Sequence, residues 1–186
     1  MEQGKEAEQA GRRGSDRGGE YLTVFLHGEA YGISILSVRE IIGMTRVPPA
    51  PETSESVKGV ITLRGKVIPV TDLRALFGLG HAEDTYRTSI VIVEVHSGRG
   101  RLPVGMIVDA VSEVVNIKDA DVEETHCFGT PCKTDCILGI AGMAGTAVKL
   151  LDIDRVLGSE ELNLFYAPRK SHSSQKNPRY KHRPNL

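Results

Sequence analysis

The sequence predicts an all-β protein with short helices, built from two small barrel-like units that arose by internal duplication. Three observations support this prediction: a β-rich stretch at 57–78, a second copy of it 80 residues later, and a composition with 20 glycines and no tryptophan. Branched aliphatic residues favour strands, and glycine supplies tight turns. The 186-residue chain is 40% hydrophobic, which is enough to bury a substantial core.

The stretch 57–78 has the pattern of a β-hairpin followed by a short helix. Val57–Leu63 and Lys66–Val70 are rich in valine and isoleucine. Arg64 and Gly65 lie between them, and glycine provides the positive φ that a tight hairpin turn requires. Asp72 is a suitable N-cap for a helix over 73–77. A helix this short is unstable alone, so we expect it to pack against the sheet.

The same stretch recurs with every residue number raised by 80. The four positions that backbone geometry constrains most, namely strand entry, turn, cap and helix end, coincide without a gap: Gly59, Gly65, Asp72 and Gly78 match Gly139, Gly145, Asp152 and Gly158. A second match precedes each copy at an offset of 73: Gly32 with 38–42 corresponds to Gly105 with 111–115. Two copies of one supersecondary unit are therefore predicted, and closing each into a barrel would remove exposed strand edges.

Composition divides the chain into a folded body and two tails. Residues 1–20 are glycine-rich and charged, which is typical of a disordered N-terminal tail. The body spans 21–166, with a first subdomain at about 31–88 and a second at about 103–158. Segments 21–30 and 89–102 contribute further strands, and 159–166 forms a terminal helix with apolar residues at helical spacing. Residues 167–186 form a flexible basic tail.

Charge and cysteine content exclude several functional classes. The body carries 13 basic and 19 acidic residues, and such an acidic surface is unsuited to nucleic acid. The apolar runs are too short to cross a bilayer, and no secretory leader opens the chain. Three cysteines, an odd number, argue against a secreted disulfide framework. We expect a cytosolic protein that is not inserted into the membrane.

Sequence signatures of catalysis are missing. The glycines at 59 and 65 are spaced one residue too widely for a phosphate-binding loop, and Val67 stands where the loop needs Ser or Thr. There is no G-x-S-x-G or H-E-x-x-H motif, and no histidine lies beside a plausible nucleophile. The sequence therefore predicts a protein that is not an enzyme and needs no cofactor.

One cysteine-rich segment leaves an alternative open. Three cysteines and a histidine within eleven residues could form a Cys3His metal or redox site, comprising His126, Cys127, Cys132 and Cys136. Their C-x4-C and C-x3-C spacings differ from the C-x2-C that opens most zinc sites. The spacing favours a loop with incidental thiols, and the metal-binding or redox-sensing reading remains the alternative function.

Arg64 and Glu40 are the charged residues that most suggest a partner. A charge at a hairpin tip is often simply solvated. The second copy has Ala144 at the position of Arg64, so the fold itself does not require arginine there. Arginine is favoured at protein interfaces, which makes presentation to a partner the functional hypothesis.

Taken together, the motifs resemble the CheW-type chemotaxis coupling proteins over about Tyr21 to Leu164. The fragments that carry the resemblance keep the family's order and spacing: Tyr31-Gly32-Ile33, Val38-Arg39-Glu40-Ile41, Val57-Lys58-Gly59-Val60, Leu63-Arg64-Gly65, Ile68-Pro69-Val70, Asp72-Leu73-Arg74, 104–109 and 150–153. The resemblance implies two five-stranded SH3-like β-barrels and no catalysis.

The resemblance also implies partners and sites. Such proteins couple the cytoplasmic tip of transmembrane chemoreceptors to the regulatory domain of the histidine kinase CheA, at arrays on the inner face of the membrane. Positions that the family uses for contact fall on Val38, Glu40, Gly59, Arg64, Gly65, Ile90 and Gly105. We expect Arg64 and Glu40 to be polar anchors, Val38 and Ile90 to line an apolar groove for a receptor helix, and the free protein to be monomeric. Use in another signalling branch remains open, and the cysteine loop and basic tail lie outside the family pattern.

Overall fold

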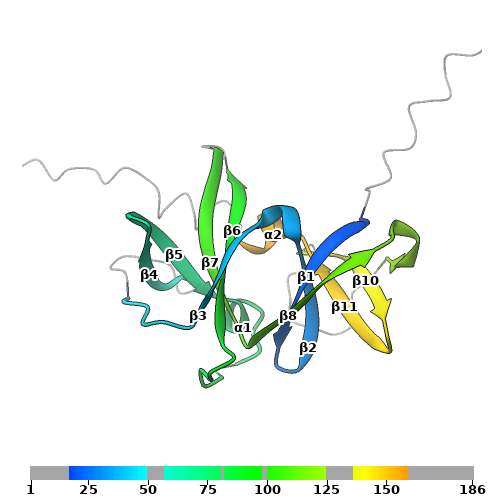
Figure 1. The fold of residues 1–186 in the computed structure, drawn as a ribbon, viewed down its shortest axis with the longest axis horizontal. Helices are drawn as coiled ribbons and strands as arrows, with labels where there is room; N and C mark the ends of the chain where they lie inside the picture. Colours follow the sequence, from blue (N-terminus) through cyan, green and yellow to red (C-terminus); the bar gives the residue numbers. More distant parts are fainter. Residues whose placement is uncertain (1–16, 50–56, 81, 98–99, 125–135, 159–186) are drawn as a thin grey trace, which may run out of the picture.

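The computed structural model describes residues 17–49, 57–80, 82–97, 100–124 and 136–158. These residues form two β-sheets side by side, which confirms the all-β prediction (Figure 1). The six-stranded sheet has the order β8 (Ala110–Ile117), β1 (Gly19–Leu26), β2 (Glu29–Ser34), β11 (Thr146–Leu151), β10 (Ile137–Met143) and β9 (Val122–Glu123). The five-stranded sheet has the order β3 (Val38–Gly43), β6 (Ser89–Ser97), β7 (Gly100–Val108), β5 (Lys66–Asp72) and β4 (Val57–Leu63).

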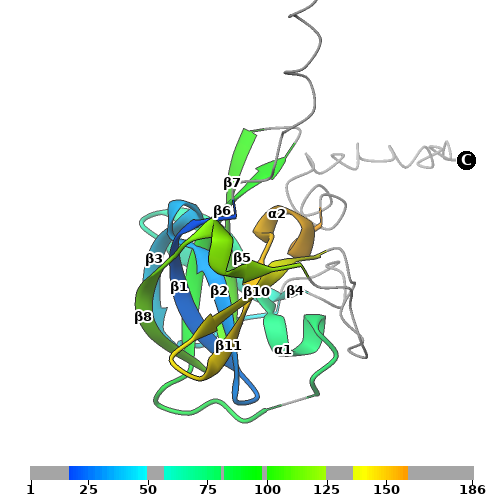
Figure 2. The same cartoon turned by 90° about the vertical axis from the view of Figure 1, so that its right-hand side faces the viewer.

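The helices are single turns, and the two α-helices among them follow the two repeated hairpins. They comprise α1 (Leu73–Leu76), α2 (Ile153–Val156) and the 3-10 turns η1 (Ile35–Ser37) and η2 (Asp119–Asp121). Asp72 accepts a hydrogen bond from the backbone of Arg74 at the start of α1, and Asp152 does the same for Arg155 at α2. Both helices lie on the side of the molecule opposite β3 and β8 (Figure 2).

The structure reproduces the predicted repeat in backbone detail. The β4–β5 and β10–β11 hairpins are antiparallel, and each has a register shift at the predicted glycine, Gly59 or Gly139. The offset of 73 is confirmed as well. Gly105 lies opposite Val70 in a parallel pair, and Gly32 lies opposite Leu150, which is Val70 plus 80. Equivalent residues of the two copies therefore occupy equivalent places in the two sheets.

Strand pairing divides the chain differently from the boundaries that the sequence suggested. Residues 31–34 belong to β2, which pairs with β1 and β11 in the six-stranded sheet and not with the first hairpin. Residues 89–97 and 100–108 form β6 and β7, which complete the five-stranded sheet. The chain crosses between sheets after β2 and again after β7, so β2 pairs with the hairpin of the second copy and β7 pairs with the hairpin of the first. Local sequence pattern defines strands but does not specify which distant strand pairs with them.

Each sheet packs around an apolar cluster, and a third cluster joins the sheets. One face of the five-stranded sheet buries Ile61, Ile68, Val70, Ile90, Ile92 and Ile107. One face of the six-stranded sheet buries Tyr21, Ala30, Ile117, Ala141, Val148 and Leu150. The shared cluster combines Leu22, Val24 and Leu26 of β1 with Val91, Val93 and Val95 of β6, together with residues of both helices. The two sheets therefore share one apolar core.

The chain beyond β3 reaches the far edge of its own sheet. Met44 N donates to Thr88 O, which extends the β3–β6 pairing, and Val60 N donates to Pro48 O at 3.0 Å. Segment 44–48 thus joins β3 to β4, and β9 has the corresponding place beside β10. This curvature is consistent with barrel closure, and the SH3-like barrel itself stays a prediction.

Order begins earlier than predicted at the N-terminus. Gly19 and Glu20 pair with Ile117 and Asn116 of β8, and Arg17 donates from its backbone to Asp119. The expectation of a disordered tail up to residue 20 is therefore wrong for 17–20. The remaining tail prediction, the terminal helix at 159–166 and the basic tail at 167–186 lie outside the described residues. In the parts of the chain that the structure covers, no helix is long and apolar enough to span a membrane.

One core hydroxyl provides a stability prediction. Thr23 is 7% exposed, and its Oγ1 has no hydrogen-bond partner among the described residues. A buried unsatisfied hydroxyl costs about 1–3 kcal/mol, so Thr23→Val should raise the free energy of unfolding by about 1 kcal/mol in urea denaturation. Thr88→Val is the control and should lower it, because Thr88 is also buried, at 2% exposed, and its Oγ1 accepts from Thr85 N at 2.7 Å. A less stable Thr23→Val protein would contradict this assignment.

Candidate functional site

The candidate site centres on the turn between β4 and β5. Arg64 has φ 51° and Gly65 has φ 77°, so the turn has the predicted left-handed backbone. Ala144 and Gly145 repeat it at 44° and 84°. The Arg64 side chain is 80% exposed, and its Nη2 lies 3.2 Å from the carboxylate of Glu40 on β3. The two predicted anchors are thus neighbours on a surface, although 24 residues separate them in sequence.

The ion pair between Arg64 and Glu40 contributes little to the stability of the fold. An ion pair with one partner 80% exposed contributes at most about 1 kcal/mol. A left-handed backbone at arginine carries a small conformational cost, and alanine fills the equivalent turn in the other copy. The stability of the fold therefore does not explain why residue 64 is an arginine. The exposed Arg64 guanidinium remains available to an acidic group of another molecule.

Val38 lies at the start of β3, beside the site. It is half-buried and packs against the shared core cluster. A bulge between Val38 and Glu40 shifts the register against β6, and the exposed Arg39 donates to Glu94 of β6. The arginine holds the pKa of the Glu94 carboxyl below its ordinary value. The bulge and the Arg39–Glu94 contact therefore hold β3 against β6, and part of the Val38 side chain stays exposed.

Ile90 and Gly105 do not lie on this surface. Ile90 is fully buried inside the five-stranded sheet, so the prediction that it lines a groove is wrong. A Cβ on Gly105 would lie 3.0 Å from Ile90 and 3.1 Å from Val70, so glycine there serves close packing. The central strand β6 is buried on both faces. Its uninterrupted apolar run, residues 90–93, is the sequence signal for that position.

Gly59 also has a structural role. A Cβ at this position would lie 2.0 Å from Pro48 O, the same oxygen that accepts the hydrogen bond from Val60. The equivalent Gly139 would bring a Cβ within 2.8 Å of Glu123 O. Both positions need glycine because another stretch of backbone passes close to the hairpin there, namely segment 44–48 at Gly59 and β9 at Gly139. Of the seven predicted contact residues, Val38, Glu40, Arg64 and Gly65 remain candidates for direct contact.

Sequence reasoning did not identify the buried Arg74 network. Arg74 on α1 is 1% exposed in its side chain, and its guanidinium binds three carboxylates. Nε and Nη2 donate to Asp72 at 2.8 and 2.7 Å, Nη2 also donates to Asp84 at 3.0 Å, and Nη1 donates to Asp109 at 3.2 Å. Asp72 and Arg74 are two residues apart, which is a visible signal. Nothing local pointed to Asp84 or Asp109.

The charges of this network stabilise one another. The hydrogen bonds that the Arg74 guanidinium donates to Asp72 raise the pKa of Arg74 above its ordinary value. Burial raises the pKa of Asp72, but the hydrogen bonds and charge of Arg74 outweigh burial and hold that pKa below its ordinary value. Asp109 also accepts from the backbone of His27 at 2.6 Å, in the turn between β1 and β2. The network therefore joins α1, the 82–88 segment and the six-stranded sheet.

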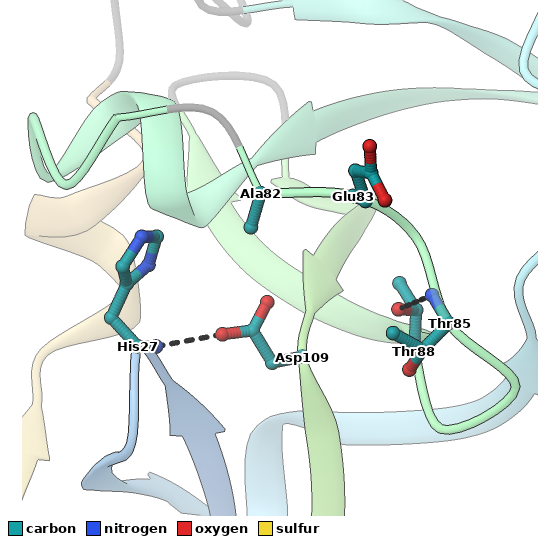
Figure 3. Close-up of a pocket in the computed structure, with 6 residues that line it drawn as sticks. All are labelled: His27, Ala82, Glu83, Thr85, Thr88 and Asp109. Carbon is teal, nitrogen blue, oxygen red and sulfur yellow. Dashed lines mark hydrogen bonds between the residues drawn. The ribbon is translucent and has the colours of Figure 1, made fainter.

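A shallow cavity of about 310 Å³ lies beside the network (Figure 3). Its lining comprises His27, Ala82, Glu83, Thr85, Thr88 and Asp109. The hydrogen bond from His27 to Asp109 uses the backbone nitrogen, so the imidazole is not oriented as a catalytic base by that carboxylate. Thr88 accepts from Thr85 N and is likewise occupied. This arrangement offers no nucleophile activated by a neighbouring base.

Most of the alternative metal site lies outside the described residues, namely His126, Cys127 and Cys132. Cys136 is described, and it is 5% exposed within the shared apolar cluster. Across the covered part of the chain, no group of three His, Cys, Asp or Glu side chains is placed to hold a metal ion. Cys136 is therefore a core residue whose packing explains its presence.

Comparison with known proteins agrees with the architecture. A family model described as "CheW-like domain" matches residues 20–161. The chain is 35% identical to the chemotaxis protein CheW of Rhizobium meliloti (strain 1021), covering 77% of this chain and 91% of that protein. It is 32% identical to CheW of Klebsiella aerogenes, covering 86% and 93%. The scaffolding protein TtCheW from Thermoanaerobacter tengcongensis matches with a TM-score of 0.67 and 29% identity, covering 81% and 94%. The chain, with its two sheets and its repeated hairpins, belongs to the CheW-like family.

Proposed function

We propose that this protein is a non-enzymatic scaffold that couples transmembrane chemoreceptors to a CheA-type histidine kinase in bacterial chemotaxis. Support comes from membership of the CheW-like family and from relatives that are named as chemotaxis and scaffolding proteins. The proposed partners are the cytoplasmic receptor tip and the kinase's regulatory domain. The proposed location is the cytoplasm, at receptor arrays on the inner face of the membrane.

The observation that carries the proposal is the exposed Arg64–Glu40 pair on a rigid turn. The turn keeps its backbone conformation in both copies, but only the first copy presents arginine. A scaffold needs a preorganised surface because ordering a mobile one on binding costs affinity. The shared core between the sheets holds this surface at a fixed position relative to the rest of the molecule.

Charge reversal at Arg64 tests the proposal. With receptor tips and CheA-type kinase, the wild-type protein should co-sediment as a ternary assembly. Arg64→Glu should reduce co-sedimentation at least about tenfold, because it places two like charges together and removes the basic anchor. Its melting temperature should stay within a few degrees of wild type, since the pair is exposed.

Lys66→Glu is the matched control, because it makes the same charge change on the same hairpin at another exposed residue. It should retain most co-sedimentation. Equal losses in the two variants would indicate nonspecific charge effects and count against Arg64 as an anchor. Intact assembly with Arg64→Glu would remove the site from the proposal, and failure of the wild-type protein to join any assembly would contradict the function itself.

A further inference from the structure

A second group of exposed arginines lies beside the candidate site. Arg39 of β3 and Arg101 of β7 both approach Glu94 of β6, the strand between them in the five-stranded sheet (Figure 1). Arg39 binds one carboxylate oxygen of Glu94, and Nη1 of Arg101 lies 3.7 Å from the other. The Glu94 side chain is 22% exposed, whereas those of Arg39 and Arg101 are 57% and 60% exposed. Each guanidinium has five N–H donors, so both keep donors for a further acceptor.

The strand register places this group on the same face of the sheet as the Arg64–Glu40 pair. Glu40 lies opposite Ile92, and directly opposite residues of an antiparallel pair point to the same face. Glu94 follows Ile92 by two positions, so its side chain points to that face as well. Glu94 is thus a diagonal neighbour of Glu40, at a spacing of about 7–8 Å. The two carboxylates, each with its arginine, are therefore adjacent on one surface.

We call this surface the arginine strip and define it by Arg39, Arg64 and Arg101. It extends from the β4–β5 turn across β3 to β6 and β7. The three arginine side chains are 57% to 80% exposed, whereas the Glu40 and Glu94 side chains that they bind are 31% and 22% exposed. The carboxylates thus lie deeper than the arginines, and an approaching molecule meets guanidinium groups first.

The six-stranded sheet has the equivalent positions without arginine. The offsets of 73 and 80 that relate the copies place Ser112, Ala144 and Gly28 where the arginine strip has its three residues. The fold therefore does not require arginine at any of them. Exposed ion pairs also contribute little to stability. Since arginine is enriched at protein interfaces, three exposed arginines on one face of one sheet indicate recognition of a partner.

We propose that the arginine strip binds an acidic segment of a partner protein, and that Arg39 and Arg101 extend the contact made by Arg64. Guanidinium groups bind carboxylates through two parallel hydrogen bonds, which fixes orientation as well as charge. Glu40 and Glu94 hold the arginine side chains in place before binding, which lowers the entropy lost on association. The inference deepens the proposed function, on which it rests, by naming the charge of the partner surface.

The charge of the rest of the molecule favours a protein partner over a polyanion. The described residues include 12 basic and 15 acidic side chains, a balance of −3. A surface that is acidic overall repels nucleic acid and anionic bilayers, which present charge over a wide area. A short acidic segment presents its carboxylates locally, so it can match the strip without meeting the acidic remainder.

Replacing the two additional arginines together tests the proposal. Arg39→Gln/Arg101→Gln should lower co-sedimentation with receptor tips and CheA-type kinase about three- to tenfold at roughly 0.1 M salt, as expected for two partly exposed charge contacts. Its melting temperature should stay within a few degrees of wild type, because both side chains are exposed. Arg46→Gln/Arg87→Gln is the matched control, since it makes the same charge change at two exposed arginines outside the strip. The control should stay within about twofold of wild type.

The outcomes separate this inference from the function on which it rests. Failure of the wild-type protein to assemble would contradict the proposed function and the inference with it. Normal assembly of the wild type together with normal assembly of Arg39→Gln/Arg101→Gln would overturn the inference alone. Equal losses in that variant and in Arg46→Gln/Arg87→Gln would also overturn it, because the effect would then follow total charge.

Adding Glu94→Gln to Arg39→Gln/Arg101→Gln distinguishes lost contacts from a newly unpaired carboxylate. The loss of co-sedimentation should persist in the triple variant, because the arginines make the proposed contacts. Full recovery would show that the unpaired Glu94 repels the partner and that the arginines only neutralise it. That result would overturn the proposal.

Carbodiimide cross-linking tests the chemistry of the partner group. Arg101→Lys keeps the charge and supplies an amine, which the reagent joins to a carboxylate as an amide while the carbodiimide takes up the water. In the ternary assembly we expect this amine to link to carboxylates of the receptor tip or the kinase, and the links to disappear at roughly 0.5 M salt. Links confined to carboxylates of its own chain would overturn the proposal. Binding of the wild type to phosphatidylglycerol vesicles that Arg39→Gln/Arg101→Gln loses would assign the strip to a lipid surface and overturn it as well.

Discussion

Replacing Arg74 with methionine is expected to lower the free energy of unfolding by about 3–5 kcal/mol. The Arg74 side chain is 1% exposed and forms ion pairs with three carboxylates. Removing it leaves Asp72 buried and without its counter-charge. Asp84 and Asp109 are about one-third exposed and can regain water, which places the expected loss toward the lower end of this range. Urea denaturation at neutral pH measures the effect.

The pH dependence of this loss has a definite sign. The pKa of Asp72 in the folded protein is depressed, so its contribution to stability is present above the unfolded value of about 3.9 and is lost as pH falls through the lower folded value. The difference between wild type and Arg74→Met should therefore be full at neutral pH and shrink below about pH 4. A difference that does not change with pH would contradict the ion-pair explanation.

Arg155→Met is the matched control for Arg74→Met. Arg155 also bonds to the N-cap aspartate of its helix, at 3.2 Å, but its side chain is 63% exposed. Its removal should cost at most about 1 kcal/mol. Comparable losses in the two variants would show that burial is not what makes the Arg74 network important.

Gly59→Ala is expected to destabilise the protein by about 3 kcal/mol or more, because the new Cβ would lie 2.0 Å from Pro48 O. That oxygen is backbone, and it is fixed by the hydrogen bond from Val60. The overlap is relieved only by separating segment 44–48 from β4. The melting temperature should fall by at least about 10 °C, since 1 kcal/mol corresponds to several degrees in a domain of this size.

Gly43→Ala is the control for this substitution. Gly43 is an exposed strand glycine, and a Cβ there meets nothing within 4 Å. Its stability should change by no more than about 0.5 kcal/mol. Gly59→Ala should also lose partner binding in proportion to its loss of folded protein. A folded, stable Gly59→Ala protein that fails to bind would restore Gly59 as a contact residue.

The fold class and the repeat could be read from the sequence because both depend on local requirements. Turn glycines, capping aspartates and runs of β-branched residues constrain the backbone wherever they occur, and the offset of 80 repeats all of them. The pair Arg64 and Glu40 could also be nominated, since Ala144 shows that the turn does not need arginine. These features depend either on residues that are close together in the sequence or on a position-by-position comparison of the two copies.

Burial of the predicted contact residues required the tertiary structure. Ile90 and Gly105 carry the same residue types whether they face a partner or a core, and only the position of β6 and β7 between two apolar clusters places them inside. Gly59 likewise looks like any strand glycine until segment 44–48 is seen against it. A resemblance to a family indicates which positions matter, but it does not show whether a residue contacts a partner or packs inside the protein.

The sequence by itself determined the strands, the duplicated hairpins with their turns and caps, and the exposed arginine that distinguishes the first copy from the second. Only the tertiary structure decided that β2 and β7 each pair with the hairpin of the other copy, and that Arg74 binds carboxylates from positions 72, 84 and 109. The physical reason is how far apart along the sequence the interacting groups lie. Backbone conformation responds to neighbouring residues, whereas strand pairing and buried charge compensation depend on groups that only the complete fold brings together.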